Sequence, residues 1–454
     1  MRHLALAALL VACGSHGDDA GDAGVDTPPE RGTVTVHVVD KLGAPLPDLH
    51  VVFIDTDSTQ TDIVTDAEGI ARAEVSIGAS ATAERASSLG CAFALTTLQQ
   101  LVPGDDVTLI SGTTNPDDPF TNRVIPADTT PAGNFTINFP SSGGAQNYRV
   151  YTPCGPTDVG TTTSPSLPFT AGCARSPMTV VVLVTSSTGL PQKYAELDNV
   201  TFAPGGSATV TDTWHDIAPV TASYTNTTTK VTRIELERYA TYLRGLPMTV
   251  GSAMPAANSG SIAITTPMPA AAIMRSRLLC ASGSGPDCVS TPTGVAQQTI
   301  TQTVTGTDAT YALDVGGNLL PWISGNYDPD TTTMQIQTSA TMFVDVFEAN
   351  LRYYRKNSIA ACTNQYIYTW RVFGPMPSSV TFPTLPSTLP GDPTVRPSDT
   401  QSAYQLYLGE SDAINGWREA IKNVYEALGV CEASPTLTSK LFTQGTLNRL
   451  SQWN

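Results

Sequence analysis

Short runs in which apolar and polar residues alternate recur along this chain, and they restrict its fold more than any other feature. The first run is Thr33–Val38, in which valine occupies every second position. A period of two turns one face of a β-strand inward, and turn sequences such as Thr65–Gly69 separate the runs. Only 14% of the residues are charged, against about 25% in typical globular proteins. The pattern predicts a mostly β fold made of serial β-sandwiches.

The length of 454 residues allows about three or four domains. Breaks in the strand pattern predict an N-terminal targeting segment, a tether, four β-sandwiches and a short α-helical C-terminus. The boundaries expected for these segments are 1–12, 13–31, 32–112, 113–240, 241–324, 325–410 and 411–454.

The C-terminal segment shows a helical pattern. Ser411 is a suitable N-cap and Gly429 a suitable C-cap. Between them an apolar stripe follows helical spacing, at Ile414, Trp417, Ile421, Val424 and Leu428. The stripe indicates a helix packed on the core, and a helix that docks on a partner is the alternative.

The N-terminus has the pattern of an export signal. Leu4–Ala12 is apolar and, at nine residues, far shorter than the roughly 20 that a membrane span needs. Leu10-Val11-Ala12-Cys13 resembles the lipobox of bacterial lipoproteins, which implies a lipid on Cys13 and cleavage after Ala12. Gly14 follows instead of aspartate, which favours an outer-membrane lipoprotein on the periplasmic or surface face of the cell envelope. An ordinary signal peptide with an unrelated cysteine is the alternative.

The first folded unit carries a second resemblance. "DKLGAPLPDLHVVFID" followed by "TDAEGIARAEV" looks like the carboxypeptidase regulatory-like module over residues 32–112. The resemblance implies an immunoglobulin- or transthyretin-like β-sandwich that supports or binds rather than catalyses, because the zinc chemistry of carboxypeptidases belongs to a separate domain. No histidine in this chain is followed by glutamate three residues later, as that zinc domain requires.

Charge restricts the possible partners. The net charge of −16 repels phosphate backbones, so a nucleic-acid partner is not expected. The expected protein is a non-catalytic, lipid-anchored cell-envelope protein. It contacts the membrane through its lipid, and it binds a protein or glycan ligand or acts as a spacer.

Seven cysteines remain once Cys13 is assigned to lipid, in a chain expected to reach an oxidising compartment. Short, turn-rich loops predict the disulfides Cys154–Cys173 and Cys280–Cys288. Elimination then pairs Cys362 with Cys431 and leaves Cys91 as a buried thiol.

Few residues suggest chemistry. The chain lacks HExxH, GxSxG and phosphate-loop motifs. The most reactive-looking triplet, Trp214-His215-Asp216, is more typical of a strand end, and His37 and Asp40 lie on opposite faces of a strand. We therefore expect no catalytic residues, no metal site and no cofactor. A hydrolase or its accessory subunit is the alternative.

Two acidic clusters offer oxygen ligands of the kind that calcium prefers. The first is Asp55, Asp57 and Asp62, and the second is Asn326, Asp328 and Asp330. Neither has an EF-hand glycine or a closing glutamate, so turns explain both clusters more simply.

Overall fold

The structure is a computed structural model of the 454-residue chain. It describes residues 30–39, 45–87, 90–111, 130–143, 146–171, 173–174, 176–187, 191–217, 220–225, 233–240, 247–253, 259–264, 271–280, 296–305, 310–321, 323–338, 344–412, 414–422 and 447–453. This part of the chain is mostly β-strand and forms serial β-sandwiches, as the sequence predicts. None of the described helices is long and apolar enough to cross a membrane.

The first module is a sandwich of seven strands. These are β1 (Arg31–Val39), β2 (His50–Ile54), β3 (Gln60–Val64), β4 (Ile70–Ser76), β5 (Ala79–Ala86), β6 (Ala92–Leu101) and β7 (Asp106–Ile110). One layer has the order β4-β1-β7 and the other contains β3-β2-β5-β6. The alternating Val34, Val36 and Val38 of β1 are fully buried in one cluster with Val51 and Phe53 of β2.

The turn between β3 and β4 has the geometry that its sequence predicts. The Asp66 side chain accepts hydrogen bonds from the backbone N–H groups of Glu68 and Ile70, at 3.1 and 2.8 Å. Gly69 has a φ of +73°, and a Cβ there would lie 2.6 Å from the carbonyl oxygen of Val38. Glycine is required at this position by both its conformation and its close approach to β1.

The same strand order recurs in two further modules. The second module contains β8 (Pro131–Asn138), β9 (Asn147–Thr152), β10 (Gly155–Gly160), β11 (Ser166–Thr170), β12 (Met178–Thr185), β13 (Pro191–Val200), β14 (Ser207–Thr209) and the two-residue β15 (His215–Asp216). The third contains β16 (Val220–Thr225), β17 (Arg233–Ala240), β18 (Pro247–Ala253), β19 (Gly260–Ile264), β20 (Ala271–Cys280), β21 (Ala296–Thr305) and β22 (Thr310–Asp314).

The pairing in all three modules is identical. The first strand is antiparallel to the fourth and parallel to the seventh. The second strand pairs with the third and the fifth, and the fifth pairs with the sixth. The chain is therefore a structural repeat of one seven-strand unit, followed by a fourth unit of different topology.

The fourth unit joins the first and third modules. It contains β23 (Ile323–Asp328), β24 (Thr333–Thr338), β25 (Val346–Lys356), β26 (Gln365–Gly374), β27 (Ser379–Thr381), β28 (Thr400–Ser411) and β29 (Leu447–Trp453), with 3-10 turns at Gly316–Asn318 and Ala360–Cys362 and the helix α1 (Trp417–Ala420). We call β25, β26, β28 and β29 the bridging strands.

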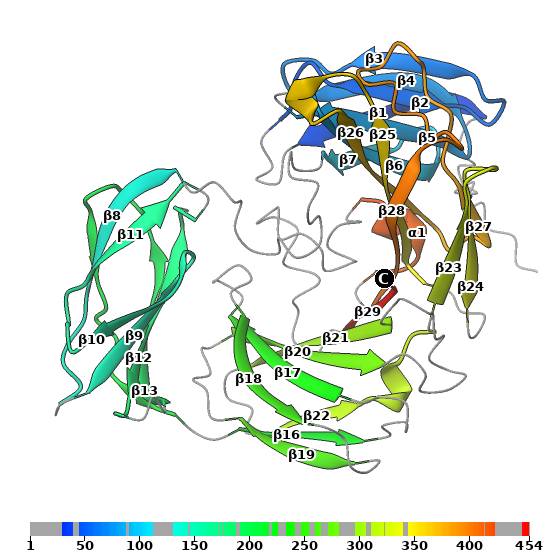
Figure 1. Cartoon of the computed structure of the whole chain (residues 1–454). Coiled ribbons are helices and arrows are strands. Elements are labelled where there is room, and N and C mark those ends of the chain that lie inside the picture. Colours follow the sequence, from blue (N-terminus) through cyan, green and yellow to red (C-terminus); the bar gives the residue numbers. More distant parts are fainter. Residues whose placement is uncertain are drawn as a thin grey trace, which may run out of the picture.

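The bridging strands lie between two equivalent edges. β26 pairs in parallel with β6, the sixth strand of the first module, and β29 pairs antiparallel with β21, the sixth strand of the third. A continuous twelve-stranded sheet results, in the order β18-β17-β20-β21-β29-β28-β25-β26-β6-β5-β2-β3. The second module has no strand in this sheet and stands apart in Figure 1, in cyan and green.

Two expected boundaries are wrong. The sequence places 220–240 in the second unit, but β16 and β17 pair within the third module, so that module begins at Val220. The predicted helical segment 411–454 contains helix only at Trp417–Ala420 among its described residues, and Leu447–Trp453 is strand β29. Ser411 ends β28 and does not cap a helix, because Gly416 holds the N-cap position.

The apolar stripe predicted for the C-terminal segment is partly confirmed. Trp417 and Ile421 are buried in the core cluster of the first module, and Ile414 packs against it. Val424, Leu428 and Gly429 lie outside the described residues.

Of the two disulfides in the described part of the chain, one follows the sequence spacing and the other does not. Cys154–Cys173 is present as expected, with Cα atoms 5.0 Å apart. Cys91 bonds to Cys362 at a Cα separation of 5.1 Å, so the expected Cys362–Cys431 pair and the free Cys91 thiol are both wrong. The cause is the β6–β26 pairing, which brings two turns 271 residues apart side by side. Cys288 and Cys431 lie outside the described residues, as does the side chain of Cys280, so the predicted Cys280–Cys288 pair stays a prediction.

Replacing both Cys91 and Cys362 with alanine should destabilise the protein more than replacing both Cys154 and Cys173. The loop-entropy relation gives an upper limit of about 5 to 6 kcal/mol for the first bridge and about 3 kcal/mol for the second. The bridges join residues 271 and 19 positions apart in the sequence. Urea denaturation of the two double variants measures the difference, and an equal or smaller loss for C91A/C362A would contradict it.

Candidate functional site

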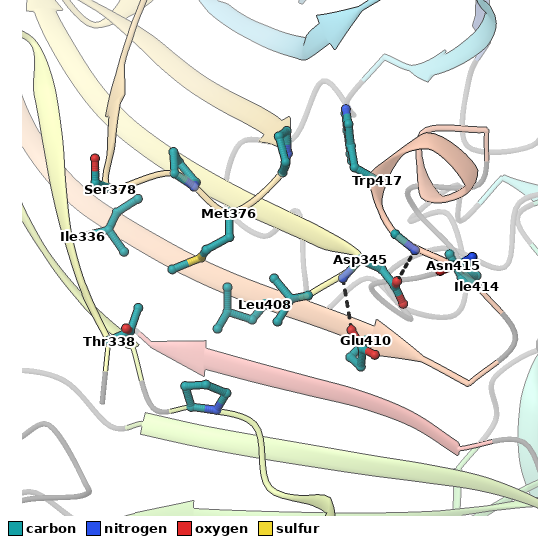
Figure 2. A pocket seen from close by; sticks show the side chains of 15 residues that line it. Ile336, Thr338, Asp345, Met376, Ser378, Leu408, Glu410, Ile414, Asn415 and Trp417 are labelled. Carbon is teal, nitrogen blue, oxygen red and sulfur yellow. Dashed lines mark hydrogen bonds between the residues drawn. The ribbon is translucent and has the colours of Figure 1, made fainter. Parts of the chain in front are cut away.

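A pocket of about 830 Å³ opens in the fourth unit (Figure 2). It lies between β24, the loop 375–378, the end of β28 and the segment that leads into α1. Apolar side chains form most of its wall, among them Ile336, Val344, Met376, Leu408 and Trp417. Its volume is in the range of pockets that hold small molecules or a few side chains of a peptide.

Two carboxylates mark one end of the pocket. Asp345 is only 3% exposed, and its two oxygens accept hydrogen bonds from the backbone N–H groups of Ser411 (2.8 Å) and Gly416 (2.7 Å). The backbone N–H of Asp345 in turn donates to Glu410 at 3.1 Å. Figure 2 shows both acids at the end near α1, while Ile336, Thr338 and Ser378 lie at the other end.

The Asp345 carboxylate holds the turn that forms this end of the pocket. The turn leaves β28 at Ser411 and enters α1 after Gly416, whose φ is +71°. A positive φ is costly for any residue but glycine, and Asp345 accepts the N–H groups at both ends of the turn. The pocket therefore depends on one buried side chain and one glycine.

Contacts with the first module fix the same end of the pocket. Trp417, Ala420 and Ile421 belong to the core cluster of that module. Arg418 forms an ion pair with Asp105 and donates to the carbonyl of Gln100 at 3.0 Å. Burying each large apolar side chain contributes about 1.5–3 kcal/mol. Trp417 belongs both to this core and to the lining of the pocket, so the wall at this end is part of a shared core.

The pocket has an electrostatic preference. Its lining contains Asp345 and Glu410 but, among the described residues, no lysine, arginine or histidine. Apolar walls with acids at one end favour a ligand that combines apolar groups with a positive charge. Sequence reasoning missed the site because its lining residues come from separate segments between Pro321 and Trp417.

Glu84 is a second unusual acid, outside the pocket. It alternates with Ala81 and Ala83, which face the core of the first module, and so lies on the opposite face of β5. The residue is 4% exposed, and neither carboxylate oxygen has a hydrogen-bond partner among the described residues. Burial raises the pKa of Glu84 to about 8, and the charge of Asp62 on β3 adds to the shift.

Each histidine of the described modules bonds to a nearby aspartate. His37 Nε2 lies 2.7 Å from Asp106, and His50 Nδ1 lies 3.0 Å from Asp62. His215 Nε2 lies 2.9 Å from Asp212, while the adjacent Asp216 faces Lys193 at 3.7 Å. The triplet Trp214-His215-Asp216 is thus a strand end in which His215 pairs with an acid that the triplet does not include.

The two acidic clusters have local partners. Asp55 pairs with Arg31 at 2.7 Å, and Asp62 bonds to His50. Asp57 accepts the N–H of Thr59 at 2.8 Å, and Asp328 accepts the N–H of Asp330 at 3.0 Å. Within the described ranges no group of three or more acidic, histidine or cysteine side chains is arranged to hold a metal. Asp40 and the proposed lipid site Cys13 lie outside these ranges.

Comparisons with known proteins give only distant likenesses. No protein-family model matches the chain, and no protein with a curated description matches it. The Bacillus anthracis TIE protein is 11% identical over 63% of this chain, with a TM-score of 0.16, and this chain spans half its length. The Streptococcal ancillary pilin is 7% identical over 63% of this chain and 98% of its own, with a TM-score of 0.18.

A Ca²⁺-stabilized adhesin that helps an Antarctic bacterium bind ice is 11% identical over 85% of this chain and 96% of its own, with a TM-score of 0.12. TM-scores of this size are too low to say anything about function.

Replacing Glu84 with glutamine should flatten the pH dependence of stability. Because the folded pKa is raised from 4.5 to about 8, the folded protein keeps a proton that the unfolded chain releases. The contribution of Glu84 to the free energy of unfolding therefore falls as the pH rises from about 4.5 to about 8, and is level above that. Each pKa unit corresponds to about 1.4 kcal/mol, so the loss is at most a few kcal/mol.

Urea denaturation at pH 4.5 and pH 8.5 measures this effect. We expect Glu84→Gln to gain stability relative to the wild type between the first pH and the second. Glu68→Gln, the same chemical change at an exposed turn position, is the control. Parallel pH curves for Glu84→Gln and the wild type would show that Glu84 does not take up a proton on folding.

Proposed function

We propose that this protein is a non-catalytic, lipid-anchored protein of the cell envelope that binds a segment of a partner protein in the pocket beside α1. The observation that carries the proposal is the pocket itself, which is apolar, acidic at one end and supported by the core of the first module. The core of the first module supports the segment that carries Trp417 at one end of the pocket.

The side chains of the pocket favour binding over catalysis. Both oxygens of Asp345 are engaged with backbone N–H groups, and the hydroxyls of Thr338 and Ser378 lie at the far end from the acids in Figure 2. Catalysis by a hydroxyl nucleophile needs a base within hydrogen-bond reach, and the two acids of this pocket lie at the opposite end from Thr338 and Ser378. This arrangement supports the binding function against the alternative of a hydrolase.

The ligand favoured by the pocket is a peptide segment and not a glycan. Sugars commonly need several polar groups for their hydroxyls, whereas most of this wall is aliphatic, proline or methionine. A lysine or arginine can lay its apolar stem along such a wall and place its charge at Glu410. We therefore propose a segment in which a basic residue is flanked by apolar residues.

The anchor is the second part of the proposal. The lipobox-like sequence ends at Cys13 and the first strand begins at Arg31. A stretched chain spans at most about 3.3–3.6 Å per residue, so this stretch reaches roughly 60 Å. The first module, which resembles a support domain, would therefore begin at most about 60 Å from an outer membrane.

Replacing Cys13 with serine should release the protein from the membrane. Lipid is added to the thiol, and acyl chains supply the membrane affinity. Fatty-acid labelling of cells followed by membrane fractionation should show label and membrane association for the wild type only. A C13S protein that still takes up label and sediments with membranes would contradict the anchor.

Replacing Met376 with glutamate should weaken peptide binding at least tenfold, because it puts a charge into the apolar wall. The probe is an array of immobilised hexapeptides of leucine and phenylalanine with one central lysine, arginine, serine or glutamate. We expect the wild type to bind the basic peptides, and Glu410→Gln to lose the preference for them.

Ile359→Glu is the matched control, because Ile359 is a 44%-exposed apolar residue outside the lining of the pocket. Equal binding of basic and acidic peptides, or equal losses for M376E and I359E, would rule out the pocket as the binding site.

A further inference from the structure

The Cys91–Cys362 disulfide closes a covalent loop around the second and third modules. Cys91 lies in the turn between β5 and β6, and Cys362 lies in the turn between β25 and β26. The stretch between them, 271 positions long, contains the whole second and third modules. The sequence before Cys91 leads to the proposed anchor. The pocket residues lie on both sides of Cys362, with Pro321–Asp345 before it and Pro375–Trp417 after it, in the fourth unit to which Cys362 belongs.

We infer that this disulfide carries mechanical tension directly from the anchored end to the ligand-binding unit, past the second and third modules. The inference rests on the proposed function, in which the membrane holds Cys13 and a partner occupies the pocket. Tension then follows the shortest covalent path, which runs from β1 to Cys91, across the sulfur–sulfur bond and on from Cys362. The second and third modules lie in a closed covalent loop and bear no load.

Noncovalent contacts align the two sides of this junction. β6 and β26 pair in parallel over seven residues, from Ala92 opposite Ile367 to Leu98 opposite Phe373. The N–H of Ile367 donates to the carbonyl of Cys91 at 3.0 Å, directly beside the disulfide. The disulfide ties the N-terminal ends of these two strands together, so they can separate only from their other ends, at Leu98 and Phe373.

Side chains cross the same junction. The ring of Tyr368 on β26 stacks on Phe93 of β6, with centroids 5.1 Å apart, and on Tyr353 of β25 at 4.6 Å. Trp370 donates its indole N–H to the hydroxyl of Thr97 at 2.9 Å. Aromatic stacking and a buried hydrogen bond keep the first module and the fourth unit in one body, with the disulfide at its edge.

Reduction of the disulfide should remove the short covalent path from Cys91 to Cys362. A dithiol reductant transfers two electrons and two protons to the disulfide, giving the thiols of Cys91 and Cys362 and a cyclic disulfide of the reductant. Once the noncovalent contacts between β6 and β26 separate, load then passes through all residues between the two thiols. At roughly 3.4 Å per residue, the 271 positions add about 900 Å to the length of the fully extended chain.

Force measurements on the full chain test the inference without lipid or ligand. The C13S protein is held by handles ligated to its two ends in magnetic tweezers, and its extended length is measured before and after dithiothreitol is added. We expect the oxidised chain to stop about 900 Å short of the reduced chain. Without reductant, C91S/C362S should extend to within about 65 Å of the reduced length, because at roughly 3.4 Å per residue the closed Cys154–Cys173 bridge withholds only 19 positions.

C154S/C173S is the control, because its disulfide lies inside the loop and joins positions only 19 apart. This variant should keep the short extension until dithiothreitol is added. An oxidised wild type that reaches the full length, or a C91S/C362S variant that remains short, would overturn the inference. Either outcome leaves the tests of lipid attachment and peptide binding unaffected.

Discussion

The architecture depends on how the open backbone edge of each module is closed. An exposed edge strand presents unpaired N–H and C=O groups and invites pairing with another chain. The sixth strands of the first and third modules, β6 and β21, are both covered by bridging strands of the fourth unit. Pairing of these two equivalent edges turns separate sandwiches into one twelve-stranded sheet and creates the junction that holds the pocket, the shared core and the Cys91–Cys362 disulfide.

The second module closes the equivalent edge with its own residues. Two residues of β15 pair with β13, and the Asp212 carboxylate accepts the N–H of Glu196 at 3.2 Å. In the described part of the chain no strand of the fourth unit pairs with β13, and the second module has no strand in the twelve-stranded sheet. The same fold is therefore used either as a link in a larger sheet or as a separate body.

The junction also contains charge that a purely apolar interface would not need. Arg371 on β26 forms two hydrogen bonds with Glu348 on β25, at 2.7 and 3.2 Å, and both side chains are buried. Burial raises the pKa of Glu348, and the charge of Arg371 opposes that rise. Such a pair adds little net stability, but removing one partner leaves a buried charge unpaired. Its geometry favours a single register of β25 on β26.

The sequence by itself determined the strands in which apolar and polar residues alternate strongly, and the turns whose residues favour a single backbone conformation. Thr33–Val38 and the turn at Asp66–Gly69 are predictable because their information is local, in side-chain period and backbone preference. The Cys154–Cys173 bridge is predictable for the same reason, since it closes a short loop. Only the tertiary structure decided that Leu447–Trp453 is a strand, that Cys91 meets Cys362, and that segments between Pro321 and Trp417 enclose a pocket. Those outcomes depend on which distant edges pair, and hydrogen bonds between backbones are the same for every sequence, so no local pattern records them.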